Sequence, residues 1–186
     1  LKKDSKGFYK LLEVSIRTAG TMSLYRGLGI NFPLWTVYNL MGYDVQLIKN
    51  DFFLEVDRAL FNRYRHNLEY ETVYLDFDDT VTKNNQVNPF VMMFIYNAIN
   101  NKKKKKLIKK NEKNLKETLF NLCINENLFD EIIHIKSNEK KFKYIVEKNK
   151  AIFIDNAFVE RAEVKKHLNI PVFDVDAIAT LINWKE

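Results

Sequence analysis

From residue 71 onward, short apolar runs alternate with longer segments in which apolar residues recur every three or four positions. The short runs are rich in β-branched, aromatic and aliphatic residues, and they predict strands that are buried on both faces. These predicted strands cover residues 72–77, 105–108, 131–135, 151–154 and 171–173. The predicted helices cover residues 88–99, 112–125, 139–148, 159–168 and 176–182. Because strands and helices alternate, the pattern predicts an α/β domain with a parallel sheet between two layers of helices.

The first 66 residues follow a different pattern. Residues 8–16 and 44–49 predict strands, residues 21–41 a long helical or mixed apolar segment, and residues 56–64 a helix. A polar stretch just before the apolar run at residue 72 marks a boundary. We therefore expect an N-terminal part, residues 1–66, and a C-terminal domain, residues 71–186. The N-terminal part is too short to bury a core of its own.

The charged residues do not change the predicted fold or indicate a macromolecular partner. The chain carries 30 Lys and Arg residues against 24 Asp and Glu residues, a net charge of +6, and much of the excess lies in lysine runs at 102–106 and 109–110. Because no aromatic residues are interleaved with these lysines, the runs favour a solvated, lysine-rich face over a nucleic-acid site. No apolar stretch approaches the ~18 residues of a membrane span. Neither nucleic acid nor a membrane is therefore an expected partner.

The single cysteine, Cys123, excludes an internal disulfide and any multi-cysteine metal site. It falls in the helix predicted over residues 112–125, which favours a buried, apolar position. Cysteine usage of this kind is typical of a reducing compartment, so a cytoplasmic location is expected.

Two acidic clusters come directly after predicted strands, where open α/β sheets bind their ligands. Asp76 and Asp78 follow the apolar run at residues 73–75, and alternation along the end of the first strand places them on the same side. Asp155, with Asn156, follows the strand at 151–154. If the two strands are neighbours, the carboxylates converge, and like charges ~4 Å apart repel by about 4 kcal/mol at an effective dielectric of roughly 20. Such a cluster needs a divalent cation or a shared proton, and oxygen-only ligands favour Mg²⁺ over zinc. The alternative is that these acids only cap helices or form turns.

The segment DFDDTV at residues 76–81 resembles the first motif of the haloacid-dehalogenase superfamily, Asp-X-Asp-X-Thr followed by an apolar residue. The resemblance covers about residues 72–182 and implies a Rossmann-like, three-layer α/β/α domain. It implies that Asp76 is the nucleophile that forms an aspartyl-phosphate and that Asp78 is the general acid and base. It also implies that Asp155, Asp76 and the backbone carbonyl of Asp78 hold Mg²⁺. The implied activity is that of a magnesium-dependent phosphatase or phosphotransferase acting on a small phosphorylated metabolite.

The same resemblance assigns two further positions. Lys141 is the choice for the lysine of the third motif, with Lys140 as the alternative. The family carries Ser or Thr at the end of the second strand, whereas Lys109 occupies that position here. A lysine attracts phosphate as a point charge but is not an equivalent hydrogen-bonding group, so a catalytically impaired partner or scaffold module is the alternative function. The short interval between Asp76 and Asp155 leaves no room for a large cap domain.

Residues 11–21 resemble the last catalytic strand of ATP-grasp ligases, which carries the motif Glu-X-Asn-X-Arg. Glu13 and Arg17 match this motif, and Ser15 stands where Asn is usual. Alternate residues on a strand point the same way, so the three side chains can share a face. The resemblance implies that residues 1–66 are the partial α+β tail of an ATP-grasp domain, in a fusion with the C-terminal domain. ATP is then an expected ligand only together with an upstream ATP-grasp region. The alternative is a half-exposed strand with polar outward positions.

Overall fold

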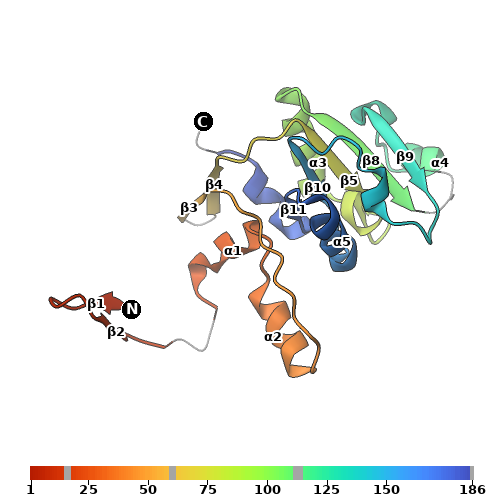
Figure 1. Cartoon of the computed structure of the whole chain (residues 1–186). Helices are drawn as coiled ribbons and strands as arrows, with labels where there is room; N and C mark the ends of the chain where they lie inside the picture. Colours follow the sequence, from red (N-terminus) through yellow and green to blue (C-terminus); the bar gives the residue numbers. More distant parts are fainter. Residues whose placement is uncertain (15–17, 59–61, 111–114, 185–186) are drawn as a thin grey trace.

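The computed structural model describes residues 1–14, 18–58, 62–110 and 115–184, and its centre is a five-stranded sheet (Figure 1). The strands are β5 (Thr72–Asp76), β8 (Lys104–Lys110), β9 (Glu131–Ile135), β10 (Ala151–Ile154) and β11 (Val172–Phe173). All neighbours pair in parallel, in the spatial order β11-β10-β5-β8-β9. Every strand predicted for the C-terminal domain is present. The chain order reverses between β5 and β10, which is where a ligand crevice is expected in such a sheet.

Helical elements cover both faces of the sheet. On one face, α3 (Pro89–Asn100) and the 3-10 helix η5 (Val175–Leu181) share a core cluster with Val73 and Leu75 of β5. On the other face, α5 (Phe158–Leu168) packs in the cluster around Tyr74. Successive residues of β5 alternate between the two faces as strand residues do, so one buried run contributes to both cores. The predicted three-layer α/β/α arrangement is confirmed.

The chain between β5 and α3 forms only a small hairpin, β6 (Thr82–Lys83) and β7 (Gln86–Val87), whose turn is made by Asn84 and Asn85 at positive φ. No large cap domain therefore lies between these two elements, as expected.

The helices of the C-terminal domain differ from the prediction in three places. The helix predicted at 139–148 is only a 3-10 turn, η4 (Lys141–Tyr144). After this turn the chain runs back along the sheet, and Glu147 accepts hydrogen bonds from the side chains of Thr72 and Lys106. The last helix, η5, is 3-10 rather than α. α4 (Leu115–Asn121) ends early, and the 3-10 turn η3 (Glu126–Leu128) follows it. Cys123 lies between them, exposed and at φ 55°, so the prediction of a buried helical cysteine was wrong.

The N-terminal part departs further from its prediction. The helix predicted at 56–64 is wrong, because β3 (Leu54–Arg58) and β4 (Asn62–His66) form an antiparallel pair with an Arg65–Glu55 ion pair of 2.7 Å across it. Apolar and charged residues alternate with a period of two in this segment, which favours a strand. Of the strand predicted at 8–16, residues 15 and 16 lie outside the described residues, and residues 8–14 contain only β2 (Tyr9–Lys10), paired with β1 (Lys2–Lys3). Residues 44–49 have no regular structure. The apolar segment at 21–41 contains the 3-10 turn η1 (Gly20–Met22), α1 (Ser23–Gly27) and α2 (Phe32–Leu40).

Buried contacts join residues 18–66 to the β11 edge of the sheet. The Asn50 side chain is fully buried and bonds to both main-chain groups of Val172, donating to its carbonyl at 2.6 Å and accepting from its N–H at 2.9 Å. An edge strand exposes unpaired backbone groups, and Asn50 satisfies two of them. Gly27 packs so closely that an added Cβ would lie 2.4 Å from Leu54 and 2.9 Å from Thr180.

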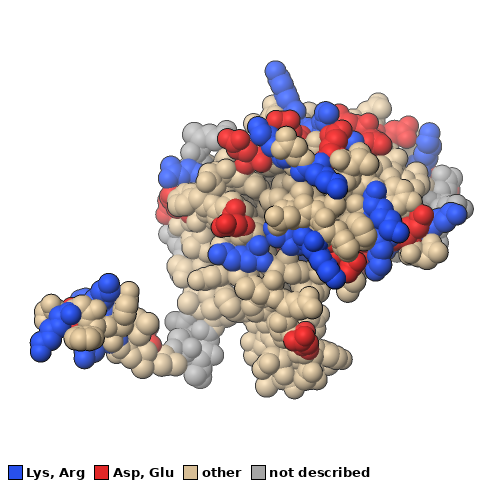
Figure 2. Space-filling view, viewed as in Figure 1, with Lys and Arg blue, Asp and Glu red and all other residues tan. Residues whose placement is uncertain are grey.

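The lysine run forms the predicted solvated face only in part, because Lys102 and Lys104 are exposed but three other lysines of the run are buried. Lys105, Lys106 and Lys109 are buried in β8, where strand geometry carries their aliphatic stems into the domain. Lys105 pairs with Asp130 at 2.7 Å and Lys106 with Glu131 at 2.8 Å. On the face drawn in Figure 2, basic and acidic side chains are interleaved over the sheet domain. Among the described residues, no helix is long and apolar enough to cross a membrane.

Candidate active site

Asp76 and Asp155 lie at the same end of the sheet, on neighbouring strands. β5 and β10 pair in register, with Leu75 opposite Ile154, so the residues that follow these two positions lie side by side. The Nζ of Lys141 contacts Asp76 Oδ1 at 2.5 Å and Asp155 Oδ2 at 2.6 Å. The expectation that the two carboxylates converge is therefore confirmed, and the lysine chosen for the third motif joins them.

This trio is almost completely shielded from solvent. Burial, followed by repulsion from Asp155, raises the pKa of Asp76 to about 7, although the Lys141 ammonium acts in the opposite direction. Burial likewise raises the pKa of Asp155. For Lys141 burial favours the neutral amine, but attraction to the two carboxylates outweighs it and the pKa is raised. The arrangement holds a charged lysine against two carboxylates that are costly to ionise together.

The Asp76 loop is tied to the turn after β10 by Thr80. The Thr80 hydroxyl lies 3.3 Å from Asp76 Oδ2 and accepts a hydrogen bond of 3.1 Å from the backbone N–H of Asn156. Asp79 adopts a left-handed conformation, φ 56°, which turns the chain back so that Thr80 can reach Asp76. Asp and Asn tolerate this conformation better than most residues, which accounts locally for an Asp at this position.

Asp78 and Lys109 form a separate pair at the edge of the trio. The Asp78 side chain is 59% exposed, and its Oδ1 lies 3.8 Å from Lys109 Nζ. The buried ammonium of Lys109 also lies 4.3 Å from the centroid of the Phe77 ring, within cation–π distance. The Asp78 carboxylate does not join those of Asp76 and Asp155, and within the described ranges no three His, Cys, Asp or Glu side chains are placed to share a metal ion. The expectation of a cluster of three or more carboxylates is not met.

The donor set nevertheless suits a magnesium ion. Mg²⁺ is commonly bound through one or two carboxylates and keeps several water molecules. Asp76 and Asp155 would supply the two carboxylates, and the family resemblance implies the backbone carbonyl of Asp78 as a third oxygen. Asp155 is held in place by a hydrogen bond of 2.7 Å from the N–H of Ala157 to its Oδ1. All the donors are oxygen, which favours magnesium over zinc.

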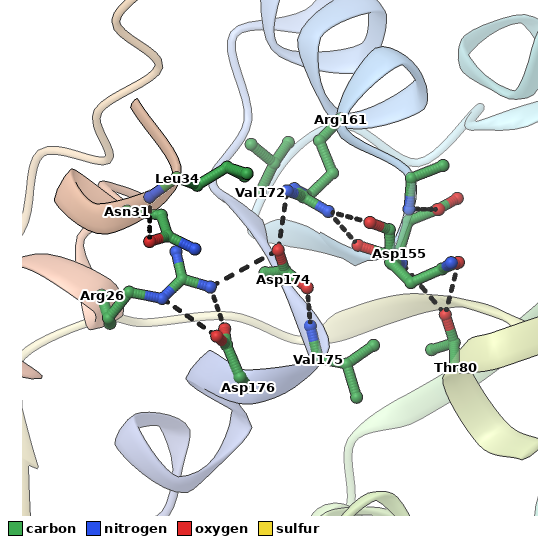
Figure 3. A network of polar contacts seen from close by, with 12 residues as sticks. Arg26, Asn31, Leu34, Thr80, Asp155, Arg161, Val172, Asp174, Val175 and Asp176 are labelled. Carbon is green, nitrogen blue, oxygen red and sulfur yellow. Dashed lines mark hydrogen bonds and ion pairs between the residues drawn. The ribbon is translucent and has the colours of Figure 1, made fainter. Parts of the chain in front are cut away.

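An ion-pair network that the sequence did not predict lies behind Asp155. Arg161 of α5 donates to the backbone carbonyls of Asp155 and Asn156 at 2.6 and 2.7 Å, and to Asp174 at 2.9 Å. Arg26 of α1 lies 3.4 Å from Asp174 and pairs with Asp176 (Figure 3). Asp174 follows β11 directly, so the strand-end rule that identified Asp76 and Asp155 could also have identified it. Nothing in the pattern of α5 distinguishes the buried Arg161 from a surface arginine.

Of the candidate nucleotide-binding residues of the N-terminal part, the structure describes only Glu13. Glu13 is exposed, in a stretch without regular structure. Ser15 and Arg17 lie outside the described residues. Their assignment therefore stays a prediction.

Comparison with known proteins adds little to this geometry. No protein-family model matches the sequence, and no curated protein matches it. An uncharacterized protein from Corynebacterium glutamicum superposes with a TM-score of 0.41 at 8% identity, over 62% of this chain and 85% of that one. The cobalt-bound deoxy-D-mannose-octulosonate 8-phosphate phosphatase from Haemophilus influenzae superposes with a TM-score of 0.38 at 10% identity, over 61% of this chain and 86% of that one. Both TM-scores are below 0.5, so neither likeness bears on the function.

Proposed function

We propose that the C-terminal domain is a magnesium-dependent phosphatase or phosphotransferase that acts through an aspartyl-phosphate on Asp76. The observation that carries this proposal is the position of Lys141, whose ammonium contacts one oxygen of Asp76 and one of Asp155 at neighbouring strand ends. The motif around Asp76, and the order of the acids and the lysine along the chain, match the haloacid-dehalogenase pattern. The proposed substrate is a small phosphorylated metabolite.

In the proposed reaction, Asp76 is the nucleophile and Asp78 the proton donor. A carboxylate oxygen of Asp76 forms a bond to phosphorus while the bond from phosphorus to the ester oxygen breaks. Asp78 gives its proton to the leaving oxygen. It later removes a proton from water, whose oxygen forms a bond to phosphorus while the bond from phosphorus to Asp76 breaks, which releases inorganic phosphate. The exposed side chain of Asp78 can exchange protons with solvent and with the leaving group. Bound Mg²⁺ would offset the negative charge of the phosphoryl oxygens.

Lys141 and Thr80 orient the nucleophile in this scheme. Lys141 keeps one oxygen of Asp76 fixed and places a positive charge where the phosphoryl group would bind. Thr80 lies within 3.3 Å of the other oxygen of Asp76 and holds the turn that carries Asp155. The raised pKa of Asp76, about 7, means that the carboxylate must lose its proton before it can attack.

A cavity of about 750 Å³ opens beside the Asp76 loop. Asp79 and Asn156 line it, together with Lys83, Asn84 and Phe90 from the β6–β7 hairpin and the start of α3, and with residues 174–176 at the start of η5. This volume falls within the roughly 300–1,000 Å³ of typical small-molecule sites. Its polar and aromatic lining suits the leaving group of a phosphorylated metabolite.

The direct test is hydrolysis of p-nitrophenyl phosphate with Mg²⁺. We expect Asp76→Asn to lower kcat by about three orders of magnitude or more, because it removes the group that forms the covalent intermediate. Asp130→Asn is the matched control, since Asp130 pairs with Lys105 outside the proposed site. Equal rates in wild type and Asp76→Asn would exclude Asp76 as the nucleophile.

Lys109 favours a second candidate function. Its ammonium stands where the family carries a hydroxyl that binds the transferring phosphoryl group, and a point charge does not replace that directed hydrogen bond. The domain would then bind Mg²⁺ without turnover, as a partner module for an ATP-grasp region. Magnesium binding without hydrolysis across a panel of phosphate esters, together with hydrolysis gained by Lys109→Ser, would support this candidate. Turnover by the wild type would contradict it.

A further inference from the structure

A second cavity lies between α2 and the start of α5, and it shares Asp174 with the lining of the cavity beside the Asp76 loop. It encloses about 500 Å³, which suits a small organic molecule. Most of its wall is aromatic or aliphatic, from α2, the loop after α2 and the start of α5. These side chains are Leu34, Trp35, Tyr38, Tyr43, Val45 and Phe158. α2 is at the lower centre of Figure 1, and the same region of Figure 2 is mostly uncharged on the face drawn.

The aromatic rings of this groove are held in position by other rings. Trp35 meets Phe32 edge to face, with centroids 5.8 Å apart, and Tyr38 meets Tyr43 in the same way at 5.9 Å. Such contacts limit the rotation of each ring before any ligand binds. Rings that are already oriented lose little side-chain entropy when a flat molecule packs against them. The groove is therefore suited to a planar ligand.

The charged side chains that line the groove do not favour the binding of an anionic ligand. Arg26 and Arg161 both line it, but their guanidinium groups are matched by carboxylates (Figure 3). Arg161 is bonded to Asp174 and to backbone carbonyls, and Arg26 is bonded to Asp176. A phosphate or carboxylate would have to compete with these partners. The flat face of a guanidinium, in contrast, still stacks on an aromatic ring when its edge is occupied.

The rim of the groove offers hydrogen-bonding groups. The carboxylate of Asp44 and the amides of Asn31 and Gln46 line it. A carboxylate accepts hydrogen bonds but donates none, so it selects a ligand with an amino group on its edge. We propose that this groove binds an uncharged heteroaromatic ring with an exocyclic amino group, the chemistry of a nucleoside base.

Isothermal titration calorimetry with adenosine tests this proposal. Adenosine carries no phosphate, so its binding does not depend on turnover at Asp76. We expect saturable binding to the wild-type chain, weakened by about 5- to 150-fold in Trp35→Leu and Tyr43→Leu, since a base loses its stacking partner. Tyr96→Leu, which alters an exposed tyrosine on α3, is the matched control and should bind like the wild type. Tyr43 is itself exposed, so its variant keeps the test valid if Trp35→Leu fails to fold.

A second titration separates the amino group from the ring. The wild type should prefer adenosine to purine riboside, which lacks the amino group, and Asp44→Ala should remove that preference. Binding that is undetectable up to about 5 mM adenosine would overturn the proposal. So would equal weakening by Tyr96→Leu and Tyr43→Leu, or loss of binding on Asp76→Asn, which would place the ligand in the catalytic site.

Discussion

The guanidinium of Arg161 donates a hydrogen bond of 2.6 Å to the backbone carbonyl of Asp155 (Figure 3). A second bond, of 2.7 Å, goes to the carbonyl of Asn156, so one side chain of α5 holds the turn that follows β10. The same guanidinium reaches Asp174 at the end of β11. The direction of the Asp155 carboxylate therefore depends on a residue that touches neither the proposed cation nor the substrate.

Replacing Arg161 tests this positioning role. We expect Arg161→Lys to raise the Mg²⁺ concentration needed for half-maximal activity by about 10- to 100-fold, as is typical when a partner of a metal ligand is lost. An ammonium cannot span two carbonyls and a carboxylate as a planar guanidinium does. KM for the phosphate ester at saturating Mg²⁺ should stay close to that of the wild type. An unchanged Mg²⁺ requirement in a variant that folds normally by circular dichroism would contradict this role.

The raised pKa of Asp76 has a consequence for stability. The folded chain keeps a proton on Asp76 up to about pH 7, whereas the unfolded chain releases it near the usual value of 3.8. Between these values the folded state binds more protons, so the free energy of unfolding falls as the pH rises, by up to about 1.4 kcal/mol per pH unit for one group.

Urea unfolding in the presence of a chelator, at pH 5 and at pH 8, measures this effect. We expect the wild type to be less stable at pH 8 and Asp76→Asn to show a smaller difference between the two pH values. Mg²⁺ should recover part of the stability at pH 8, because it binds the ionised carboxylates. Identical pH dependence in the two proteins would show that Asp76 titrates normally.

Replacing Asn50 tests how residues 18–66 are attached to the sheet. Asn50→Ala would leave the N–H and carbonyl of Val172 without these partners, at a cost of about 1–3 kcal/mol for each buried group. We expect a lower unfolding midpoint in urea and more rapid hydrogen exchange at Val172. Asn39→Ala, at an exposed position of α2, is the control. A midpoint shared by Asn50→Ala and the control would mean that the contact contributes nothing measurable to stability.

The sequence predicted the sheet better than the segments attached to it. Runs such as Val73 to Leu75 are apolar at every position, which leaves a buried parallel strand as the natural interpretation. The helix predicted over residues 56–64 is wrong because apolar and charged residues alternate along β3 and β4, which favours strands. Lys105 and Lys106 were expected on a solvated face although both fall in the strand predicted over residues 105–108, and burial of that strand carries their stems into the domain.

The site residues that come directly after an apolar strand could be predicted from the sequence. Asp76 and Asp155 were found from the apolar runs before them, and Lys141 was found by family resemblance. Asp174 obeys the same strand-end rule but was passed over. Arg161 could not be found, since its burial depends on how α5 packs against the turn after β10. The Asp78 carboxylate lies apart from the other two because β5 ends at Asp76 and Asp78 belongs to the loop that follows. The alternation of side chains along a strand does not apply to residues of a loop.

A titration with Mn²⁺ followed by electron paramagnetic resonance tests the central claim most directly. If Asp76 and Asp155 share one cation, the wild type will bind one equivalent, Mg²⁺ will displace it, and Asp76→Asn and Asp155→Asn will each weaken binding by a large factor while Asp130→Asn does not. Binding that survives both substitutions unchanged would contradict a cation site between these two carboxylates.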